Sequence, residues 1–206
     1  FRNSGQTCIA ANRILVQESI HEKFVAALCA RAQQIQVGHG LEQATQMGPL
    51  IDERGLEKVE RLVADATDKG AKVQVGGERH EAGGTYFQPT VMTDVSTDMD
   101  LAHEELFGPV AAISTFSEEQ DAISMANDTP YGLAGYFYSR DVGRIFRVAD
   151  ALDVGIVGVN TGLISTEVAP FGGVKESGIG REGSKYGIDD WTELKYICLA
   201  GLGAVA

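Results

Sequence analysis

Hydrophobic and polar positions along the chain follow two different patterns. Strand patterns, either alternating or rich in β-branched residues, occupy 13–17, 71–75, 110–116, 133–139 and 154–159. The spacing of a helix with one buried side occurs after Ser19, in 53–69, from Ser117 to about 126, and in 141–152. Strands that alternate with helices predict βαβ units. We therefore expect an α/β fold with a mostly parallel sheet flanked by helices.

Three helix ends have recognisable caps in the sequence. Ser19 and Glu22 have the spacing of a capping box, in which each side chain accepts from the other residue's backbone N–H. Ser117 and Gln120 repeat that pattern with a glutamine. Gly70 is placed to close the second helix, because glycine readily takes the left-handed conformation found after many helices.

The pattern changes after residue 160. Residues 161–187 are rich in glycine and show little periodicity. A last alternating segment at 191–199 predicts a strand that pairs outside its own sheet, with another subunit. We therefore expect one domain over 1–188, followed by an oligomerisation strand and tail over 189–206.

Charge and composition narrow the choice of partners. The chain has 206 residues, 44% of them hydrophobic, and a net charge of −12, which is the balance of a soluble globular protein. An acidic surface repels phosphate groups, so nucleic acid and anionic membrane are not expected partners. A negatively charged substrate would also be repelled at long range, so a local cation in a pocket would have to hold it.

The cysteines are few and widely spaced: Cys8, Cys29 and Cys198. An odd, sparse set indicates a reducing compartment, and we expect a cytoplasmic protein without disulfides. The four histidines are scattered, so no metal site is expected. No apolar run is long enough for a transmembrane helix, and no signal peptide is visible.

The first eight residues, FRNSGQTC, hold the candidate nucleophile Cys8. A thiol reacts as its thiolate, which needs a positive or dipolar environment at neutral pH. Arg2 and the backbone N–H groups of the Gly5-Gln6 turn could provide it. Spacing alone favours the alternative that Cys8 is a small buried apolar residue, as we expect for Cys29 on the first helix.

Four ordered motifs resemble those of the aldehyde dehydrogenase superfamily, and they span essentially the whole chain. They are 1–8 (FRNSGQTC), 104–109 (EELFGP), 127–133 (NDTPYGL) and 170–178 (PFGGVKESG). The resemblance implies that Cys8 attacks an aldehyde to give a thiohemiacetal and then a thioester, with its own backbone N–H donating to the oxyanion. Within the superfamily, the sequence is most like the succinate-semialdehyde dehydrogenases.

The same resemblance implies an NAD or NADP cofactor. Glu105 would bind the nicotinamide ribose and Phe107 would pack beside the ring. Taken without the motif, Glu104 and Glu105 read as an exposed acidic turn. The main coenzyme-binding domain, the general-base glutamate and an oxyanion-hole asparagine would precede the thiol and are absent from this sequence. We therefore expect the chain alone to be inactive.

For the substrate, the resemblance implies an aldehyde with a distal carboxylate. Arg2 would pair with that carboxylate, with Ser165 as a second contact, since a guanidinium can hold a carboxylate through two charge-assisted bonds. Phe171 would line the same pocket, although a role in the core is nearly as well supported. Arg2 as a surface charge and Ser165 as a loop hydroxyl are the alternatives.

Other functions stay open at this point. Glutarate semialdehyde or another ω-oxo acid would fit the same residues, because Arg2 cannot measure chain length. A non-catalytic assembly domain is the alternative from another class. The full-length protein is expected to be a homo-oligomer, either a dimer or a tetramer.

Two patterns are excluded. Some family members carry a second cysteine two residues after the nucleophile, as a disulfide switch, but this chain has Ala10 there. Residues 178–183 match G-x-G-x-x-G, yet no hydrophobic strand immediately precedes them, as a dinucleotide-binding fingerprint requires.

Overall fold

The computed structural model describes residues 1–203, and its main sheet has four strands in the order β1-β4-β3-β2. These strands are β1 (Arg13–Gln17), β4 (Val110–Phe116), β3 (Thr90–Thr93) and β2 (Lys72–Val75). β1 and β3 both run parallel to β4, whereas β2 is antiparallel to β3. The predicted α/β fold with a mostly parallel sheet is confirmed.

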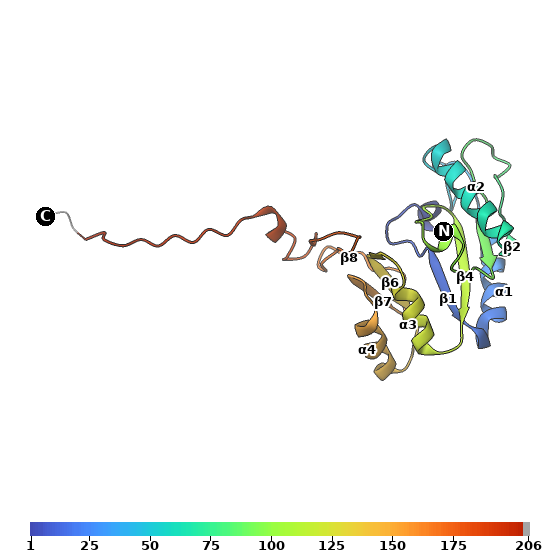
Figure 1. Ribbon diagram of the computed structural model, residues 1–206. Coiled ribbons are helices and arrows are strands. Elements are labelled where there is room, and N and C mark those ends of the chain that lie inside the picture. Colours follow the sequence, from blue (N-terminus) through green and yellow to red (C-terminus); the bar gives the residue numbers. More distant parts are fainter. Residues whose placement is uncertain (204–206) are drawn as a thin grey trace.

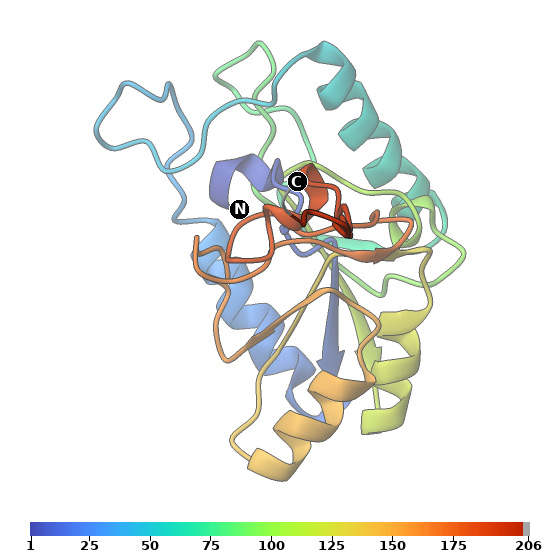
Figure 2. The same cartoon turned by 90° about the vertical axis from the view of Figure 1, so that its left-hand side faces the viewer.

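Helices cover both faces of this sheet, as Figure 2 shows. α1 (His21–Ala32) packs on one face, and α2 (Glu53–Asp68) packs on the other. Neighbouring side chains of β4 point to opposite faces of the sheet. Ile113 belongs to the buried cluster between the sheet and α1 (the α1 core), and Ala112 belongs to the buried cluster between the sheet and α2 (the α2 core). A sheet buried on both faces needs apolar residues at consecutive positions, which explains the continuous apolar run that begins β4.

The second half of the chain adds two small sheets and two helices beside β1 and β4 (Figure 1). β5 (Tyr131–Gly132) pairs antiparallel with β8 (Val174–Lys175), and β6 (Ala134–Phe137) pairs parallel with β7 (Ile156–Val159). The helices are α3 (Glu119–Asn127) and α4 (Val142–Ala151). Four short 3-10 helices are η1 (Arg2–Gly5), η2 (Glu18–Ile20), η3 (Asp100–Ala102) and η4 (Asp189–Trp191). No helix within residues 1–203 is long and apolar enough to cross a membrane.

Both predicted capping boxes are wrong, although both helices exist. Ser19 lies inside η2, and α1 begins at His21 without a side-chain cap. The box of α3 is one residue later than predicted, between Glu118 and Asp121. Several neighbouring side chains can accept a backbone N–H at such sites, and spacing alone does not rank them. The predicted close of α2 is confirmed, since Gly70 follows the helix with a φ of 107°.

The strand predictions miss β3 and the two-residue strands β5 and β8. β3 has only four residues, but Val91 and Met92 are fully buried in the centre of the sheet. A run this short, after Pro89, has too few positions to show a period. The strand expected at 133–139 contains β6, whereas β5 lies just before that range and belongs to a different sheet.

The C-terminal segment 192–203 extends away from the body of the protein (Figure 1). Its large apolar side chains are exposed, with Leu194 and Tyr196 among them. Residues 191–199 form no strand within the single chain that the structure describes. Their expected partner is another subunit, so the oligomerisation strand and the domain boundary at 188 stay predictions.

An ion-pair cluster ties α3 to α4. Glu119 accepts from Arg147 and from Arg144, both at 2.7 Å. These arginines, Arg147 first, lower the pKa of Glu119 from 4.5 to about 2. Since the pKa is lowered in the folded state, the pairing stabilises the fold above pH 4.5, and its contribution is lost as the pH falls from 4.5 to about 2.

Glu119→Gln should therefore lower the free energy of unfolding at neutral pH. It should also make the loss of stability between pH 4.5 and 2 less steep than in the wild type. Urea unfolding at several pH values measures both effects. Glu57→Gln, at an exposed position on α2 without an ion pair in the described part of the chain, is the control. If the free energy of unfolding fell equally steeply with decreasing pH in Glu119→Gln and in the wild type, the prediction would be contradicted.

Candidate active site

Cys8 lies exposed on a tight turn between η1 and β1. The Ala10 N–H donates to the Thr7 carbonyl at 2.9 Å, so Cys8 and Ile9 are the two central residues of the turn. The Cys8 N–H donates to no acceptor within residues 1–203. The alternative that Cys8 is a buried apolar residue is therefore wrong. Cys29 does pack against the α1 core, and burial raises the pKa of its thiol.

The residues before the turn adopt an unusual backbone conformation. Asn3, Ser4 and Gly5 all have positive φ, at 51°, 57° and 73°. The Ser4 hydroxyl donates to the Gly48 carbonyl at 2.7 Å, and Gln6 accepts from the Ile51 N–H at 2.8 Å. The loop at 48–51 thus holds a strained segment in one conformation, as positive φ at non-glycine residues requires.

The thiol loop and the EELFGP loop touch directly. A methyl group on Gly5 would overlap the Gly108 carbonyl, so the two backbones approach more closely than any side chain allows. Asn12 accepts from the Leu106 N–H at 3.3 Å on the far side of the turn. Two motifs that lie about 100 residues apart in the chain therefore form one unit.

Gly5→Ala should separate these two loops. The substitution combines a left-handed backbone with a steric overlap, and each effect costs roughly 1–3 kcal/mol. We expect the free energy of unfolding to fall by about 2 kcal/mol or more, as measured in urea. Gly40→Ala is the control, because Gly40 has no positive φ and a Cβ atom there would meet no atom within 4 Å. Equal losses for the two variants would show that the close approach does not matter.

Tyr136 of β6 is a site residue that the sequence analysis missed. Its hydroxyl donates to the Ile9 carbonyl at 2.8 Å, inside the thiol turn. Burial and the nearby Cys8 thiolate raise the pKa of Tyr136. The contact joins residues 127 positions apart in the chain, and no periodicity could indicate it.

The two glutamates of EELFGP have different environments. Glu104 accepts from Arg61 of α2 at 2.6 Å. Glu105 is exposed and forms no ion pair among the described residues. Phe107 is 37% exposed, with a φ of 45°. Both glutamates are exposed, as in an acidic turn, but Glu104 is paired with Arg61, whereas Glu105 and Phe107 present free side chains.

The three predicted substrate residues lie on separate loops. Arg2 is exposed in η1, and Ser165 is exposed in the loop that follows β7. Phe171 is half-buried and forms a backbone bridge with Glu182. No hydrogen bond or ion pair joins Arg2, Ser165 and Phe171 within residues 1–203.

The motifs at 127–133 and 170–178 are hydrogen-bonded to each other. Lys175 donates to the Asn127 and Thr129 carbonyls at 2.9 and 3.2 Å. The Ser177 hydroxyl accepts from the Gly132 N–H at 2.9 Å. The PFGGVKESG segment thus positions β5, which β6 follows directly in the chain, and Tyr136 on β6 reaches the thiol turn.

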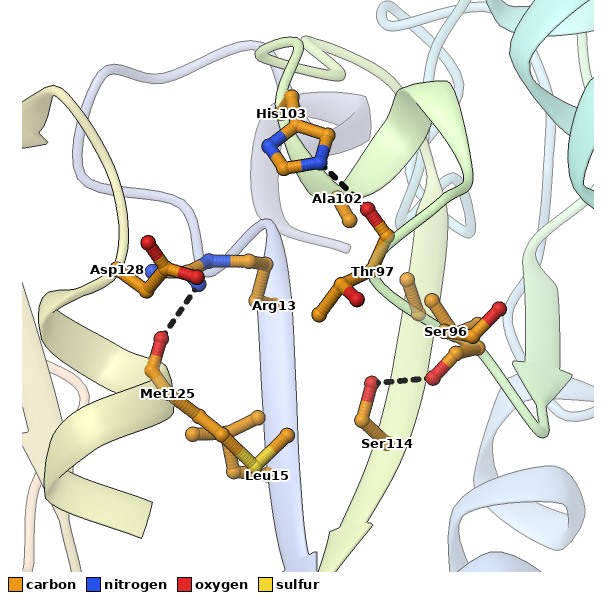
Figure 3. Close-up of a pocket in the computed structure, with 11 residues that line it drawn as sticks. Arg13, Leu15, Ser96, Thr97, Ala102, His103, Ser114, Met125 and Asp128 are labelled. Atoms are coloured by element: carbon orange, nitrogen blue, oxygen red, sulfur yellow. Dashed lines mark hydrogen bonds between the residues drawn. The ribbon is translucent and has the colours of Figure 1, made fainter. Parts of the chain in front are cut away.

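A small cavity of about 40 Å³ lies between β1, β4 and the end of α3 (Figure 3). Arg13 extends across it and donates to the Met125 and Ala126 carbonyls, both at 2.7 Å. Burial lowers the pKa of Arg13, and the charge of Asp128 opposes that effect. The cavity has room for a few water molecules at most, and none of the predicted site residues lines it. We interpret Arg13 as the connection between α3 and the sheet.

The G-x-G-x-x-G match at 178–183 has no phosphate-binding geometry. It follows the two-residue strand β8, and no α-helix begins at its end. The Arg181 N–H donates to Asp190 at 2.8 Å, so it is not free to bind a phosphate. The exclusion made from the sequence is confirmed.

Comparison with known proteins identifies the class. The family model described as "Aldehyde dehydrogenase family" matches residues 1–197. The chain therefore belongs to the aldehyde dehydrogenase family. It is similar to the mitochondrial succinate-semialdehyde dehydrogenase of rice, with 58% identity over 98% of this chain and 38% of that protein.

Two further relatives refine the comparison. Glutarate-semialdehyde dehydrogenase of Pseudomonas aeruginosa is 53% identical over 98% of this chain and 42% of that protein. The crystal structure of succinate-semialdehyde dehydrogenase from Burkholderia pseudomallei superposes with a TM-score of 0.95 and 54% identity, over 97% of this chain and 42% of that one. The chain thus resembles the succinate-semialdehyde dehydrogenases most, and it spans about two fifths of the length of these relatives.

Proposed function

We propose that this chain supplies the nucleophile and the substrate contacts of an NAD(P)-dependent succinate-semialdehyde dehydrogenase. The observation that carries the proposal is the exposed Cys8, which lies on a turn held by the EELFGP motif and by Tyr136 of β6. The similarity to the rice and Burkholderia enzymes supports the substrate class.

Cys8 would carry the covalent chemistry. Its thiolate sulfur adds to the aldehyde carbon, and the carbonyl oxygen becomes an oxyanion that accepts from the Cys8 N–H. Loss of hydride from the resulting thiohemiacetal leaves a thioester. Water then adds to the thioester, the sulfur leaves as thiolate, and succinate is released. The bound NAD(P) supplies the acceptor for the hydride.

Glu105 and Phe107 would contact that cofactor. The side chains fit this role, because Glu105 is a free acceptor for ribose hydroxyls and Phe107 presents an exposed ring. Glu104 is already engaged by Arg61. Glu105→Gln should raise KM for the cofactor about tenfold, the value of one bond to a charged acceptor. Glu104→Gln is the matched control and should leave this KM unchanged. A similar rise in both variants would contradict the assignment.

The test of the whole proposal uses an enzyme with all its parts. We define the completed enzyme as this chain preceded by the part of the Burkholderia enzyme that this chain does not cover. The completed enzyme should form reduced cofactor with succinate semialdehyde, and the chain alone should not. Failure of a folded completed enzyme to oxidise the aldehyde would refute the proposal.

Glutarate semialdehyde is the second candidate substrate, because a relative of similar identity is named for it. It is one methylene longer, and Arg2, Ser165 and Phe171 do not fix the chain length. Values of kcat/KM for the two aldehydes with the completed enzyme decide between them. A higher value for glutarate semialdehyde would move the assignment to the longer substrate.

A non-catalytic assembly domain is the remaining alternative, and the exposed apolar side chains of 192–203 favour it. Alkylation by iodoacetamide separates the two, because an activated thiol reacts faster than a free one. If Cys8 in the completed enzyme reacts no faster than Cys198, the assembly role is favoured. The oligomeric state stays a prediction. The cytoplasmic location also stays a prediction, because the rice relative is named as mitochondrial.

A further inference from the structure

We propose that Tyr136 is a positioning residue that orients and polarises the Cys8 N–H through the backbone of the thiol turn. This inference rests on the proposed function, in which that N–H stabilises the oxyanion. It concerns a residue from β6, which lies outside the motif that contains Cys8.

The connection follows from which groups share a peptide unit. The Tyr136 hydroxyl donates to the Ile9 carbonyl at 2.8 Å. The same peptide unit carries the Ala10 N–H, which donates to the Thr7 carbonyl at 2.9 Å. The Thr7 carbonyl in turn belongs to the peptide unit of the Cys8 N–H. Two hydrogen bonds and two peptide units therefore link the Tyr136 hydroxyl to the proposed oxyanion donor.

Such a chain of bonds affects the last donor in two ways. Each hydrogen bond polarises the next peptide, so the Cys8 N–H becomes a stronger donor. The bonds also fix the plane of the Thr7–Cys8 peptide, so the N–H needs no reorientation when the oxyanion forms. The Cys8 N–H has no acceptor among the described residues, so its direction is set by the turn and by the bonds that hold the turn.

The surroundings of Tyr136 keep its hydroxyl in this position. Tyr136 is paired with Gly158 across β6 and β7. A Cβ atom on Gly158 would lie 2.6 Å from the Tyr136 ring, so glycine makes the room that the ring needs. Burial, and to a lesser extent the Cys8 thiolate, raise the pKa of Tyr136 and keep the hydroxyl protonated. A protonated hydroxyl is the form that can donate.

We call the two hydrogen bonds and two peptide units between the Tyr136 hydroxyl and the Cys8 N–H the relay. Tyr136→Phe in the completed enzyme tests it, and Tyr138→Phe, at an exposed tyrosine, is the matched control. The single-turnover rate of cofactor reduction should fall about fivefold to tenfold, which is less than the about 10²–10³-fold loss for removal of a whole oxyanion donor. KM for succinate semialdehyde should not change, and the urea midpoint should fall only by the small amount that one hydrogen bond contributes. Iodoacetamide alkylation of Cys8 should also keep its rate, because displacement of iodide forms no oxyanion.

The outcomes separate this inference from the proposed function. A completed enzyme that does not oxidise the aldehyde would refute the proposed function. An active enzyme in which Tyr136→Phe reacts as fast as Tyr138→Phe would overturn the relay alone. Equal losses in alkylation and in cofactor reduction would also overturn it, because they would show that Tyr136 only holds the thiol in place.

Discussion

Cys8→Ala should abolish aldehyde oxidation by the completed enzyme. Without the sulfur no thiohemiacetal forms, and hydride would have to leave from a far less reactive aldehyde or its hydrate. Removal of a covalent nucleophile costs about 10⁴–10⁶-fold in kcat in enzymes of comparable mechanism. The rate of cofactor reduction measures the loss, and mass spectrometry of the quenched reaction should show the acylated Cys8 peptide only in the wild type.

Cys198→Ala is the control for this experiment. Cys198 is also an exposed free cysteine, but it lies on the C-terminal segment, far along the chain from the thiol turn. We expect it to retain the wild-type rate. Comparable activities of Cys8→Ala and Cys198→Ala would eliminate the covalent mechanism.

Arg2→Ala should raise KM for succinate semialdehyde by about 10–150-fold, because a charge-assisted bond contributes about 1.5–3 kcal/mol. The protein carries a net charge of −12, so a local cation is needed to hold an anionic substrate against long-range repulsion. KM for butanal, an aldehyde of the same length without the carboxylate, should stay unchanged. Steady-state kinetics with both aldehydes measures the difference.

Arg140→Ala controls for the loss of one positive charge from an acidic protein. Arg140 is exposed and has no ion pair among the described residues. If Arg140→Ala raised KM as much as Arg2→Ala does, general electrostatic attraction would explain the effect. An unchanged KM in Arg2→Ala would remove the assignment of the carboxylate contact.

The fold could be predicted where one period runs over many residues. α2 shows a stripe from Leu56 to Ala66, and both its extent and its glycine end agree with the sequence analysis. β3 could not be predicted, because its four residues are buried on both faces and show no alternation. The capping boxes of α1 and α3 were predicted wrongly for a different reason: several adjacent polar side chains can cap a helix, and packing decides among them.

The candidate site was only partly predictable. The motifs indicated Cys8 and Glu105, but their sequence could not show that Cys8 is exposed or that Glu105, and not Glu104, is free. Tyr136 was missed because its role depends on a contact across the fold. Side chains whose function comes from tertiary contacts leave no local pattern.

The thiol turn is held by residues that lie far along the chain, and this has a consequence during protein synthesis. Cys8 is among the first of these residues to leave the ribosome, whereas the groups that hold its turn come from 48–51, 106–108 and Tyr136. At about 5–20 residues per second, Tyr136 is made roughly 6–25 s after Cys8. During that interval the thiol turn lacks its contact with Tyr136. Cys8 then reacts with electrophiles only as an ordinary cysteine thiol does.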